Sequence, residues 1–227
     1  MIRGVVFDVD HTLFDRYATL RAILPEARGR FALAEGVTDE ELTEAWIAAD
    51  KRFVHFGWPK MFGELAKTGV FADPAPAPNE LGAFLRDTFS RVAVPFPYAR
   101  PTLCELRRRG LRLAVITNGK SALQRKKLEM IGLTDLFDEI LVSEEAGVEK
   151  PDPAIFRVME RRLGLPASEL CYVGDNEVND VKGARAAGWL PVWIRTTGSW
   201  EFPEIPMPRF CIDTVRDLLD FDFERMG

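Results

Sequence analysis

Two aspartates near the N-terminus have a spacing that suits paired carboxylate chemistry. Asp8 and Asp10 follow the apolar residues 5–7, and a single residue separates them. Because side chains alternate along an extended chain, both carboxylates point to the same side if the backbone stays extended. An aspartate-rich turn has the same composition, so this pair alone leaves both interpretations open.

Two further polar segments lie where a strand would pass into a loop, as Asp8 and Asp10 do. Thr117 and Asn118 end an apolar run and precede Gly119. A hydroxyl and an amide beside a flexible glycine can bind a phosphate oxygen, although an ordinary strand-to-helix turn has the same composition. Lys150 stands before Pro151, which biases the lysine toward an extended backbone. A solvent-exposed lysine is the alternative interpretation.

The fourth polar segment is acidic. An apolar run leads into Asp175 and then Asp180, although acidic residues also suit the first turn of a helix. If the apolar runs are strands of one parallel sheet, the aspartates of the first and fourth segments meet at one edge. Two carboxylates about 4 Å apart repel by roughly 4 kcal/mol at an effective dielectric constant of about 20. Such a cluster calls for a cation, and hard oxygen ligands favour Mg²⁺.

The elements that would position these segments alternate along most of the chain. Short apolar runs predict strands, and segments with helical apolar spacing predict helices between them. The predicted strands are residues 2–10, 111–117, 140–143, 171–173, 190–194 and 210–212, and the predicted helices are residues 102–109, 121–131, 154–163 and 181–187, with a closing helix after the last strand. This alternation predicts an α/β fold with a doubly wound, Rossmann-like parallel sheet covered by helices on both faces.

Residues 17–94 differ from the rest because their apolar spacing is helical throughout. Thr38 with Glu41 predicts a capping box at the start of one amphipathic helix. Asn79 is the predicted N-cap of another, and the Ala-Pro-Ala-Pro segment 75–78 before it is expected to be a loop. The helical segment is therefore an insertion between the first strand and the rest of the sheet.

We expect two domains, an α/β hydrolase core formed by residues 1–15 and 96–227 and a helical cap formed by residues 16–95. An insertion after a strand's carboxyl end lies over the crevice where open α/β sheets bind ligands, so the cap is placed to act as a lid. The cap residues that are candidates to face this crevice are Arg16, Tyr17, Lys51, Arg52, His55, Trp58 and Lys60.

The composition argues against several classes of partner and location. The chain has 35 acidic and 30 basic residues, so it lacks the cationic field that drives binding to nucleic acids or anionic membranes. Its three cysteines lie far apart and form no CxxC motif, which suits a reducing compartment. The first apolar run is too short for a signal peptide or a membrane span. These features predict a cytoplasmic protein, and they leave its oligomeric state open between monomer and homodimer.

The four segments together resemble the motifs of the haloacid dehalogenase-like hydrolase superfamily, of the kind with a helical cap inserted after the first motif. The resemblance covers essentially the whole chain, and the motifs occur in the family's order. The corresponding segments are Asp8-Val9-Asp10-His11-Thr12, Thr117-Asn118, Lys150-Pro151, and Gly174-Asp175 with Asp180. His11 is a departure, because many relatives have glycine at this position.

The resemblance implies a phosphatase that hydrolyses small phosphate monoesters of phosphorylated metabolites. Asp8 would attack phosphorus and form an aspartyl phosphate, which water then hydrolyses. Asp10 would serve as the general acid and then as the general base. Lys150 would hold Asp8 and the phosphate, while Thr117 and the backbone around Asn118 would donate hydrogen bonds to the phosphoryl oxygens.

The resemblance also implies how Mg²⁺ is bound. The implied ligands are a carboxylate oxygen of Asp8, the backbone carbonyl of Asp10 and the side chain of Asp175. Asp180 would support the site by orienting Lys150 or a water bound to the metal.

Three other functions fit the same scaffold. A 2-haloacid dehalogenase uses the same nucleophile on carbon, but dehalogenases of this kind lack the carboxylate that Asp10 supplies. A phosphosugar mutase requires a lid that keeps water away from the phosphorylated enzyme. The third, a non-catalytic binding module, is opposed by the intact set of polar residues Asp8, Asp10, Lys150 and Asp175. Phosphoglycolate, sugar phosphates and nucleoside monophosphates all remain open as substrates.

Overall fold

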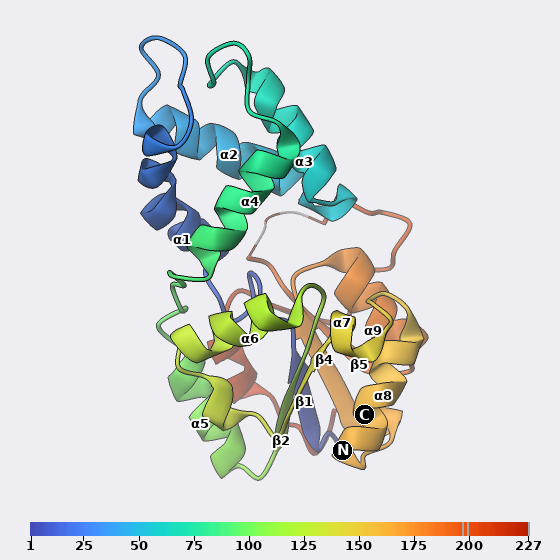
Figure 1. Cartoon of the computed structure of the whole chain (residues 1–227). Helices are drawn as coiled ribbons and strands as arrows, with labels where there is room; N and C mark the ends of the chain where they lie inside the picture. The colour runs from blue at the N-terminus through green and yellow to red at the C-terminus, as the bar shows by residue number, and fades with distance from the viewer. Residues whose placement is uncertain (197, 199, 227) are drawn as a thin grey trace. The chain divides into compact units, whose positions relative to one another are not determined.

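The computed structural model of the protein describes residues 1–196, 198 and 200–226, and for His55 the backbone alone. It consists of two compact units. One contains Met1–Asp15 and Pro95–Gly227, and the other contains Arg16–Val94. Figure 1 follows the chain from its N-terminal strand through the helical unit and back into the α/β unit.

The α/β unit is built on one parallel sheet. Its strands are β1 (Gly4–Phe7), β2 (Arg112–Thr117), β3 (Glu139–Val142), β4 (Leu170–Gly174), β5 (Leu190–Ile194) and β6 (Phe210–Ile212). The strand order is β3-β2-β1-β4-β5-β6, and every neighbouring pair is parallel. The predicted strands are confirmed, although β1 is shorter than predicted. The chain adds strands to one side of β1 and then, from β4 onward, to the other, so the crevice between the carboxyl ends of β1 and β4 is a topological switch point.

Helices cover both faces of this sheet, as predicted. The helices are α5 (Ala99–Arg108), α6 (Ser121–Met130), α7 (Ser143–Ala146), α8 (Pro153–Leu163) and α9 (Gly183–Ala186), with the 3-10 helices η4 (Thr134–Leu136), η5 (Ala167–Glu169) and η7 (Val215–Asp220) and the π-helix η6 (Glu177–Lys182). Figure 1 shows α5 and α6 on one face and α8 and α9 on the other. On the second face, Val6, Ile116 and Tyr172 from three strands pack against Phe156 and Met159 of α8.

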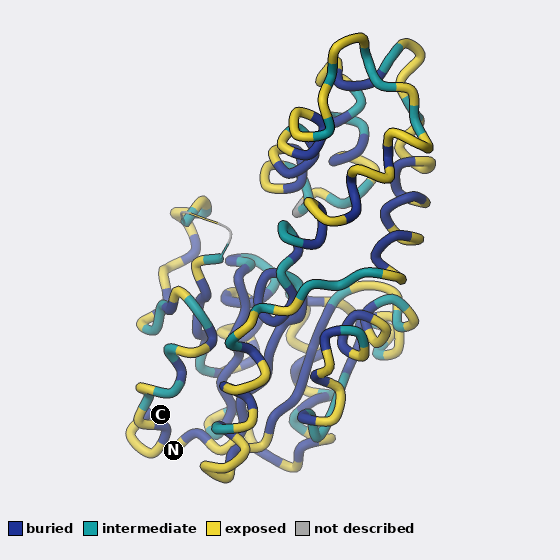
Figure 2. The backbone as a smooth tube through the Cα atoms, turned by 90° about the vertical axis from the view of Figure 1, so that its left-hand side faces the viewer, coloured by how far each residue is buried: buried dark blue, intermediate teal, exposed yellow. Residues whose placement is uncertain are grey.

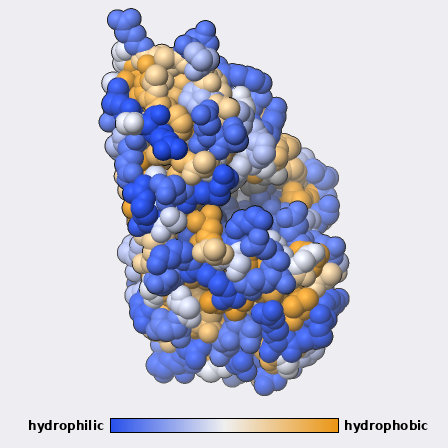
Figure 3. Space-filling model, viewed as in Figure 1, coloured by the Kyte–Doolittle hydropathy of each residue, from blue (hydrophilic) through white to orange (hydrophobic). Residues whose placement is uncertain are grey.

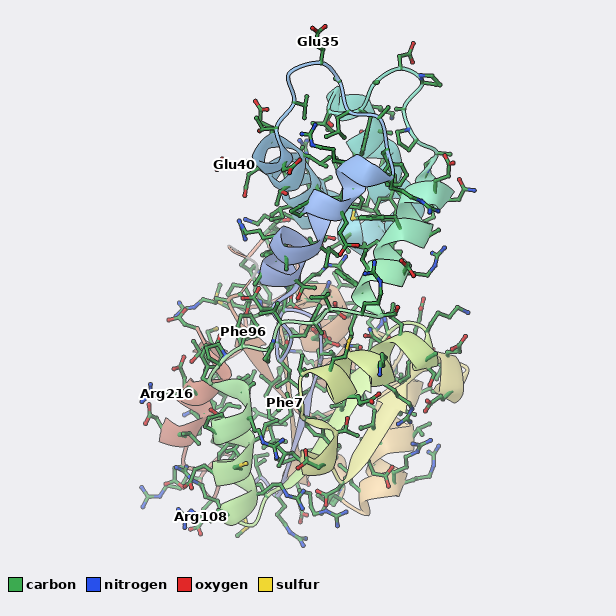
Figure 4. All side chains as sticks on the ribbon, turned by 60° about the vertical axis from the view of Figure 1, so that its left-hand side comes forward. Phe7, Glu35, Glu40, Phe96, Arg108 and Arg216 are labelled. Carbon is green, nitrogen blue, oxygen red and sulfur yellow. The ribbon has the colours of Figure 1, made fainter. Side chains whose placement is uncertain are left out.

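The burial pattern follows from this layering. Figure 2 shows the strands buried along their length, whereas the helices alternate between buried and exposed residues. In Figure 4, Phe7 lies within the sheet layer, while Arg108 at the end of α5 points outward. The surface in Figure 3 is mainly hydrophilic, with small scattered hydrophobic groups. No helix in the described part of the chain combines the length and the apolar composition that crossing a membrane requires.

Two helices of this unit differ from their predicted form. The helix predicted at 181–187 begins earlier, because the side chain of Asn176 accepts hydrogen bonds from the N–H groups of Val178 and Asn179 and starts the π-helix η6, which leads into α9. The predicted closing helix is the 3-10 helix η7, whose capping residue Thr214 lies just before it.

The second unit is helical, as its apolar spacing predicts. Its elements are α1 (Arg16–Ile23), α2 (Asp39–Phe53), α3 (Trp58–Leu65) and α4 (Pro78–Phe89), with the 3-10 helices η1 (Leu24–Gly29), η2 (Val54–Phe56) and η3 (Ala66–Thr68). The aromatic ring of Trp46 packs edge-on against Phe62, with ring centroids 5.6 Å apart, and also contacts Phe84. Glu35 extends outward from a loop of this unit in Figure 4.

One of the two predicted caps in the helical unit is confirmed and the other is wrong. Thr38 and Glu41 form the predicted capping box of α2. Asn79 lies inside α4, which begins at Pro78 with Ala77 as its N-cap. Proline suits the first helical position because its missing N–H has no partner there in any case. The side chain of Glu80 then accepts a hydrogen bond from the Ala77 N–H at 2.9 Å.

Candidate active site at the carboxyl edge of the sheet

A buried lysine connects two of the predicted carboxylates. Lys150, with 3% of its side chain exposed, donates hydrogen bonds from Nζ to Oδ1 of Asp8 at 2.8 Å and to Oδ1 of Asp180 at 2.7 Å. It also donates to the hydroxyl of Tyr172 at 2.7 Å, and this hydroxyl donates to the carbonyl of Ile116 at 2.6 Å. An ammonium group has three donors, so these three bonds fix the position of Lys150.

The parallel sheet explains why residues so distant in sequence meet. Asp8 directly follows β1, and its backbone N–H donates to the carbonyl of Val173 on the neighbouring strand β4 at 2.9 Å. Asp175 directly follows β4. Asp180 lies in η6, where Oδ2 accepts a hydrogen bond from the N–H of Asn176 at 3.0 Å. All these groups therefore lie at the switch point between β1 and β4.

Three aspartates at this edge form a cluster that fits a divalent cation. One carboxylate oxygen from each of Asp8, Asp175 and Asp180 lies within 4.8 Å of the other two, and all three residues are buried. A donor set of carboxylate oxygens is the chemistry that Mg²⁺ prefers. Both carboxylate oxygens of Asp180 accept hydrogen bonds, from Lys150 and from the Asn176 N–H, whereas Lys150 contacts Oδ1 of Asp8. The carboxylates of Asp8 and Asp175 are therefore the better placed to hold the ion.

Burial and neighbouring carboxylates raise the pKa values of two aspartates in the cluster. Burial raises the pKa of Asp8 to about 6; Lys150 opposes this rise, and the charges of Asp180 and Asp10 add to it. Burial also raises the pKa of Asp175 well above its ordinary value, with Asp180 and Asp8 contributing. Burial tends to lower the pKa of Lys150, but the charges of Asp180 and Asp8 outweigh it and raise that pKa. A bound cation would relieve the repulsion among the carboxylates.

We expect Mg²⁺ to stabilise the protein more at pH 7.5 than at pH 5. The folded-state pKa of Asp8, about 6, lies above its ordinary value of 3.8, so the metal-free protein loses stability as the pH rises through this interval. Above it the carboxylate of Asp8 is available to the ion, whereas at pH 5 a proton competes for it. At a Mg²⁺ concentration a hundred times Kd, binding adds about 2.7 kcal/mol to the free energy of unfolding, which raises Tm by several degrees. Thermal melts at both pH values, with MgCl₂ and with NaCl of equal ionic strength, measure the rise in Tm that Mg²⁺ causes. A rise of the same size at pH 5 and pH 7.5 contradicts the expectation.

Asn118 links the second polar segment to the third. Its side-chain Nδ2 donates to the carbonyl of Lys150 at 2.9 Å, and its Oδ1 accepts from the Lys150 N–H at 2.9 Å. These two bonds fix the backbone that carries the buried lysine. A contact between Asn118 and a substrate would therefore come from its backbone. Thr117, at the end of β2, is buried beside it.

Asp10 is held by two residues that the sequence patterns do not single out. Nζ of Lys127 lies 2.8 Å from both carboxylate oxygens of Asp10, and Nε2 of Gln124 lies 3.2 Å from Oδ2. The carboxylate of Asp10 is thus bound to α6 and lies outside the cluster of three aspartates. Asp10 still lies at the same edge of the sheet, because Gln124 also contacts Thr117 at the end of β2 and the charge of Asp10 adds to the raised pKa of Asp8. The available signal was the spacing of Gln124 and Lys127, which places both on one face of a helix just after the second polar segment.

The backbone at His11 explains why glycine is common there in the family that the chain resembles. His11 has φ 59, in the left-handed region that favours glycine. Its N–H donates to the carbonyl of Phe14 at 3.0 Å, which closes the turn after β1. The residue is buried, so the histidine at this position is accommodated within the packed turn.

The cap residues expected to face the crevice have identifiable contacts within the helical unit. Arg16 is buried and donates to Oδ1 of Asp50 at 2.7 Å. Its guanidinium also lies 6.0 Å from the ring centroid of Trp58. Lys51 lies over the ring of Tyr17. Among the remaining candidates, Arg52 lies over the ring of Phe53 and Lys60 pairs with Glu64, while the side chain of His55 is outside the described part of the structure.

We expect Gly174→Ala to disrupt the site. A Cβ atom at Gly174 would overlap the carboxylate of Asp180, so Asp180 must move and weaken its bond to Lys150. A displacement of about 1 Å in a catalytic group can cost 10²-fold in rate, so we expect a loss of kcat on that order. Gly63→Ala is the matched control, because a Cβ there meets no atom within 4 Å. Steady-state kinetics compare the two variants, and a fully active Gly174→Ala protein contradicts the expectation.

Comparisons with known proteins find relatives over most of the chain. A family model described as haloacid dehalogenase-like hydrolase matches residues 2–188. The chain is 36% identical to the glyceraldehyde 3-phosphate phosphatase of Methanopyrus kandleri over 97% of both chains. It is 48% identical to the phosphoserine phosphatase of Thermus thermophilus, over 84% of this chain and 87% of that protein.

A solved structure with the same fold also matches nearly the whole chain. The structure of the HAD-hydrolase YfnB from Bacillus subtilis, bound to magnesium, aligns with a TM-score of 0.75 at 25% identity. The alignment covers 96% of this chain and 97% of that one. The two chains therefore share one architecture from end to end.

Proposed function

Because this chain belongs to the haloacid dehalogenase-like hydrolase family, we propose that it is a Mg²⁺-dependent phosphatase that hydrolyses small phosphate monoesters through an aspartyl phosphate on Asp8. The observation that carries this proposal is the meeting of three buried carboxylates with the buried ammonium of Lys150. An anionic nucleophile approaches an anionic phosphate only where positive charge offsets the repulsion between them.

In the first step, a carboxylate oxygen of Asp8 attacks phosphorus, and the bond between phosphorus and the ester oxygen breaks. Lys150 bonds to Oδ1 of Asp8, which leaves Oδ2 as the attacking atom. Asp10 gives a proton to the departing ester oxygen. The product alcohol leaves, and the phosphoryl group remains on Asp8.

In the second step, water hydrolyses the aspartyl phosphate. Asp10, now a carboxylate, takes a proton from the water as its oxygen attacks phosphorus. The bond between phosphorus and Asp8 breaks, which releases inorganic phosphate and restores the carboxylate. The presence of a carboxylate at position 10 is the reason to favour this chemistry over dehalogenation.

The other residues of the site stabilise the charge on the phosphoryl group. Lys150 and the hydroxyl of Thr117 contact its oxygens, and backbone N–H groups around Asn118 donate to them. Asp8, the backbone carbonyl of Asp10 and Asp175 would hold Mg²⁺, and Asp180 orients Lys150. When bound, the ion supplies positive charge that stabilises the phosphoryl oxygens in the transition state.

The relatives suggest a substrate class. Glyceraldehyde 3-phosphate and phosphoserine, which name the two relatives described above, are both primary phosphate esters of three-carbon compounds. We therefore place such small metabolites first among the substrates. The helical unit, Arg16–Val94, is proposed to be the cap that selects the leaving group, and the protein is proposed to act in the cytoplasm.

The proposed function is tested with a panel of phosphate esters. We expect p-nitrophenyl phosphate and at least one three-carbon phosphate ester to be hydrolysed with Mg²⁺, and we expect EDTA to stop the reaction until Mg²⁺ is restored. Phosphate release measures the rate, and 2-chloropropionate is the comparison substrate. Release of chloride without metal, with no release of phosphate from any ester, contradicts the proposal.

A further inference from the structure

The lysine on α6 that contacts Asp10 is unusual because it is almost completely buried. Only 2% of the side chain of Lys127 is exposed, although its neighbour Lys126 is 45% exposed. Burying an ammonium group costs several kcal/mol unless it is well paired, and lysine is almost never fully buried without a partner. The partner here is Asp10, bonded through both carboxylate oxygens. The ammonium also lies 4.9 Å from the ring centroid of Phe14.

A second residue of α6 contacts the same carboxylate. Gln124 is buried, and its Nε2 lies 3.2 Å from Oδ2 of Asp10, 3.1 Å from Oγ1 of Thr117 and 2.8 Å from the carbonyl of Asn118. One amide group therefore connects the first polar segment to the second. Since Gln124 and Lys127 are three residues apart, both side chains leave the same face of α6.

These contacts restrain a side chain that would otherwise rotate. An aspartate has two side-chain torsions, and proton transfer requires its carboxylate within hydrogen-bond distance of the reacting oxygen. Asp10 keeps 22% of its side chain exposed, so packing alone does not fix it. The two α6 residues supply donors from the buried side.

We propose that Gln124 and Lys127 are positioning residues that hold the carboxylate of Asp10 where it exchanges a proton with the leaving-group oxygen. This assignment depends on the phosphatase activity proposed above. It adds that two residues of α6 are needed for efficient proton transfer by Asp10. Neither residue contacts phosphorus or the ester oxygen in this role. Lys127 acts through Asp10, and Gln124 acts through Asp10 and also contacts Thr117 and Asn118.

The test compares two leaving groups. p-Nitrophenolate departs with little need for a proton, whereas an alkoxide needs one. We expect Lys127→Met to lower kcat/KM, which reports the steps up to departure of the alcohol, about 10²-fold on the best three-carbon phosphate, the lower end of what general acid–base catalysis contributes. The loss of kcat/KM on p-nitrophenyl phosphate should be much smaller. Lys127→Arg should restore part of the lost rate, because it also donates to both oxygens.

A double-mutant cycle separates positioning from a general structural role. If Lys127 acts through Asp10, adding Lys127→Met to Asp10→Asn produces little further loss of kcat/KM. Lys126→Met is the matched control on the same helix and should behave as wild type. If Lys127→Met does not fold, Gln124→Leu gives the second measurement. Because Gln124 also contacts Thr117 and Asn118, part of its loss is common to both esters, but the loss on the three-carbon ester should be the larger. Equal losses on both esters, or losses that add fully to those of Asp10→Asn, overturn the assignment.

A failure of the proposed function would look different. Wild-type protein that hydrolyses no phosphate ester with Mg²⁺ contradicts the phosphatase itself. Wild-type protein that is active, with Lys127→Met active to the same degree on both esters, contradicts the positioning role alone.

Discussion

Asp8→Asn should abolish phosphatase activity while the protein remains folded. An amide oxygen is a much weaker nucleophile than a carboxylate, so the covalent step is lost, and we expect kcat to fall at least about 10⁴-fold. The comparison is wild-type protein assayed with Mg²⁺ on the same ester.

The stability of this variant distinguishes loss of chemistry from loss of structure. The pKa of Asp8 is raised to about 6 by burial, which means that the ionised side chain is unfavourable in the folded protein at neutral pH. We therefore expect Asp8→Asn to melt no lower than wild type at pH 7.5 in EDTA. Asp220→Asn, at an exposed position at the end of η7, removes the same charge and should keep full activity. Substantial activity in Asp8→Asn contradicts the assignment of the nucleophile.

Lys150→Met should destabilise the protein and inactivate it. Methionine has a similar length but no charge, so Asp8 and Asp180 lose the cation that both contact. Removing one partner of a buried ion pair typically costs 3–5 kcal/mol, which corresponds to a fall in Tm of about 10 °C for a protein of this size. The loss should be smaller at pH 5, because Asp8, whose pKa burial raises to about 6, is then largely protonated and repels its neighbours less. Differential scanning calorimetry at pH 7.5 and pH 5 measures the fall in Tm.

A surface lysine provides the control for this variant. Lys120 pairs with Glu144 at 2.8 Å, but its side chain is 74% exposed. Exposed pairs contribute about 0–1 kcal/mol, so Lys120→Met should leave the stability nearly unchanged. If Lys150→Met is as stable as Lys120→Met, the buried ammonium does not have the structural role that its three hydrogen bonds indicate.

The fold was largely predictable because its signals are local. Each strand of the sheet is a short apolar run, and alternation with helical segments specifies parallel pairing. The site was predictable for a related reason, since polar residues at the ends of parallel strands must meet at one edge. Asp8 and Asp175 illustrate this, because they directly follow β1 and β4, which are neighbours in the sheet.

The burial of Lys127 and the start of α4 escaped prediction for different reasons. Lys127 follows Arg125 and Lys126 in a strongly charged helix, a pattern typical of a solvated face, and only the approach of Asp10 buries it. Asn79 has the composition of an N-cap, but Pro78 is a better first helical residue and moves the start of α4 toward the N-terminus. Pairing with a distant side chain decides the first case, and the local preference of proline decides the second.

The most direct measurement is chemical identification of the phosphorylated residue. Protein reacting with a phosphate ester and Mg²⁺ is quenched rapidly and treated with borohydride, which reduces an aspartyl phosphate to homoserine, and the peptides are analysed by mass spectrometry. We expect homoserine at position 8 in wild-type protein, only when both the ester and Mg²⁺ are present, and none in Asp8→Asn. An active enzyme that shows unmodified aspartate at position 8, or a phosphorylated residue elsewhere, would contradict the covalent role of Asp8.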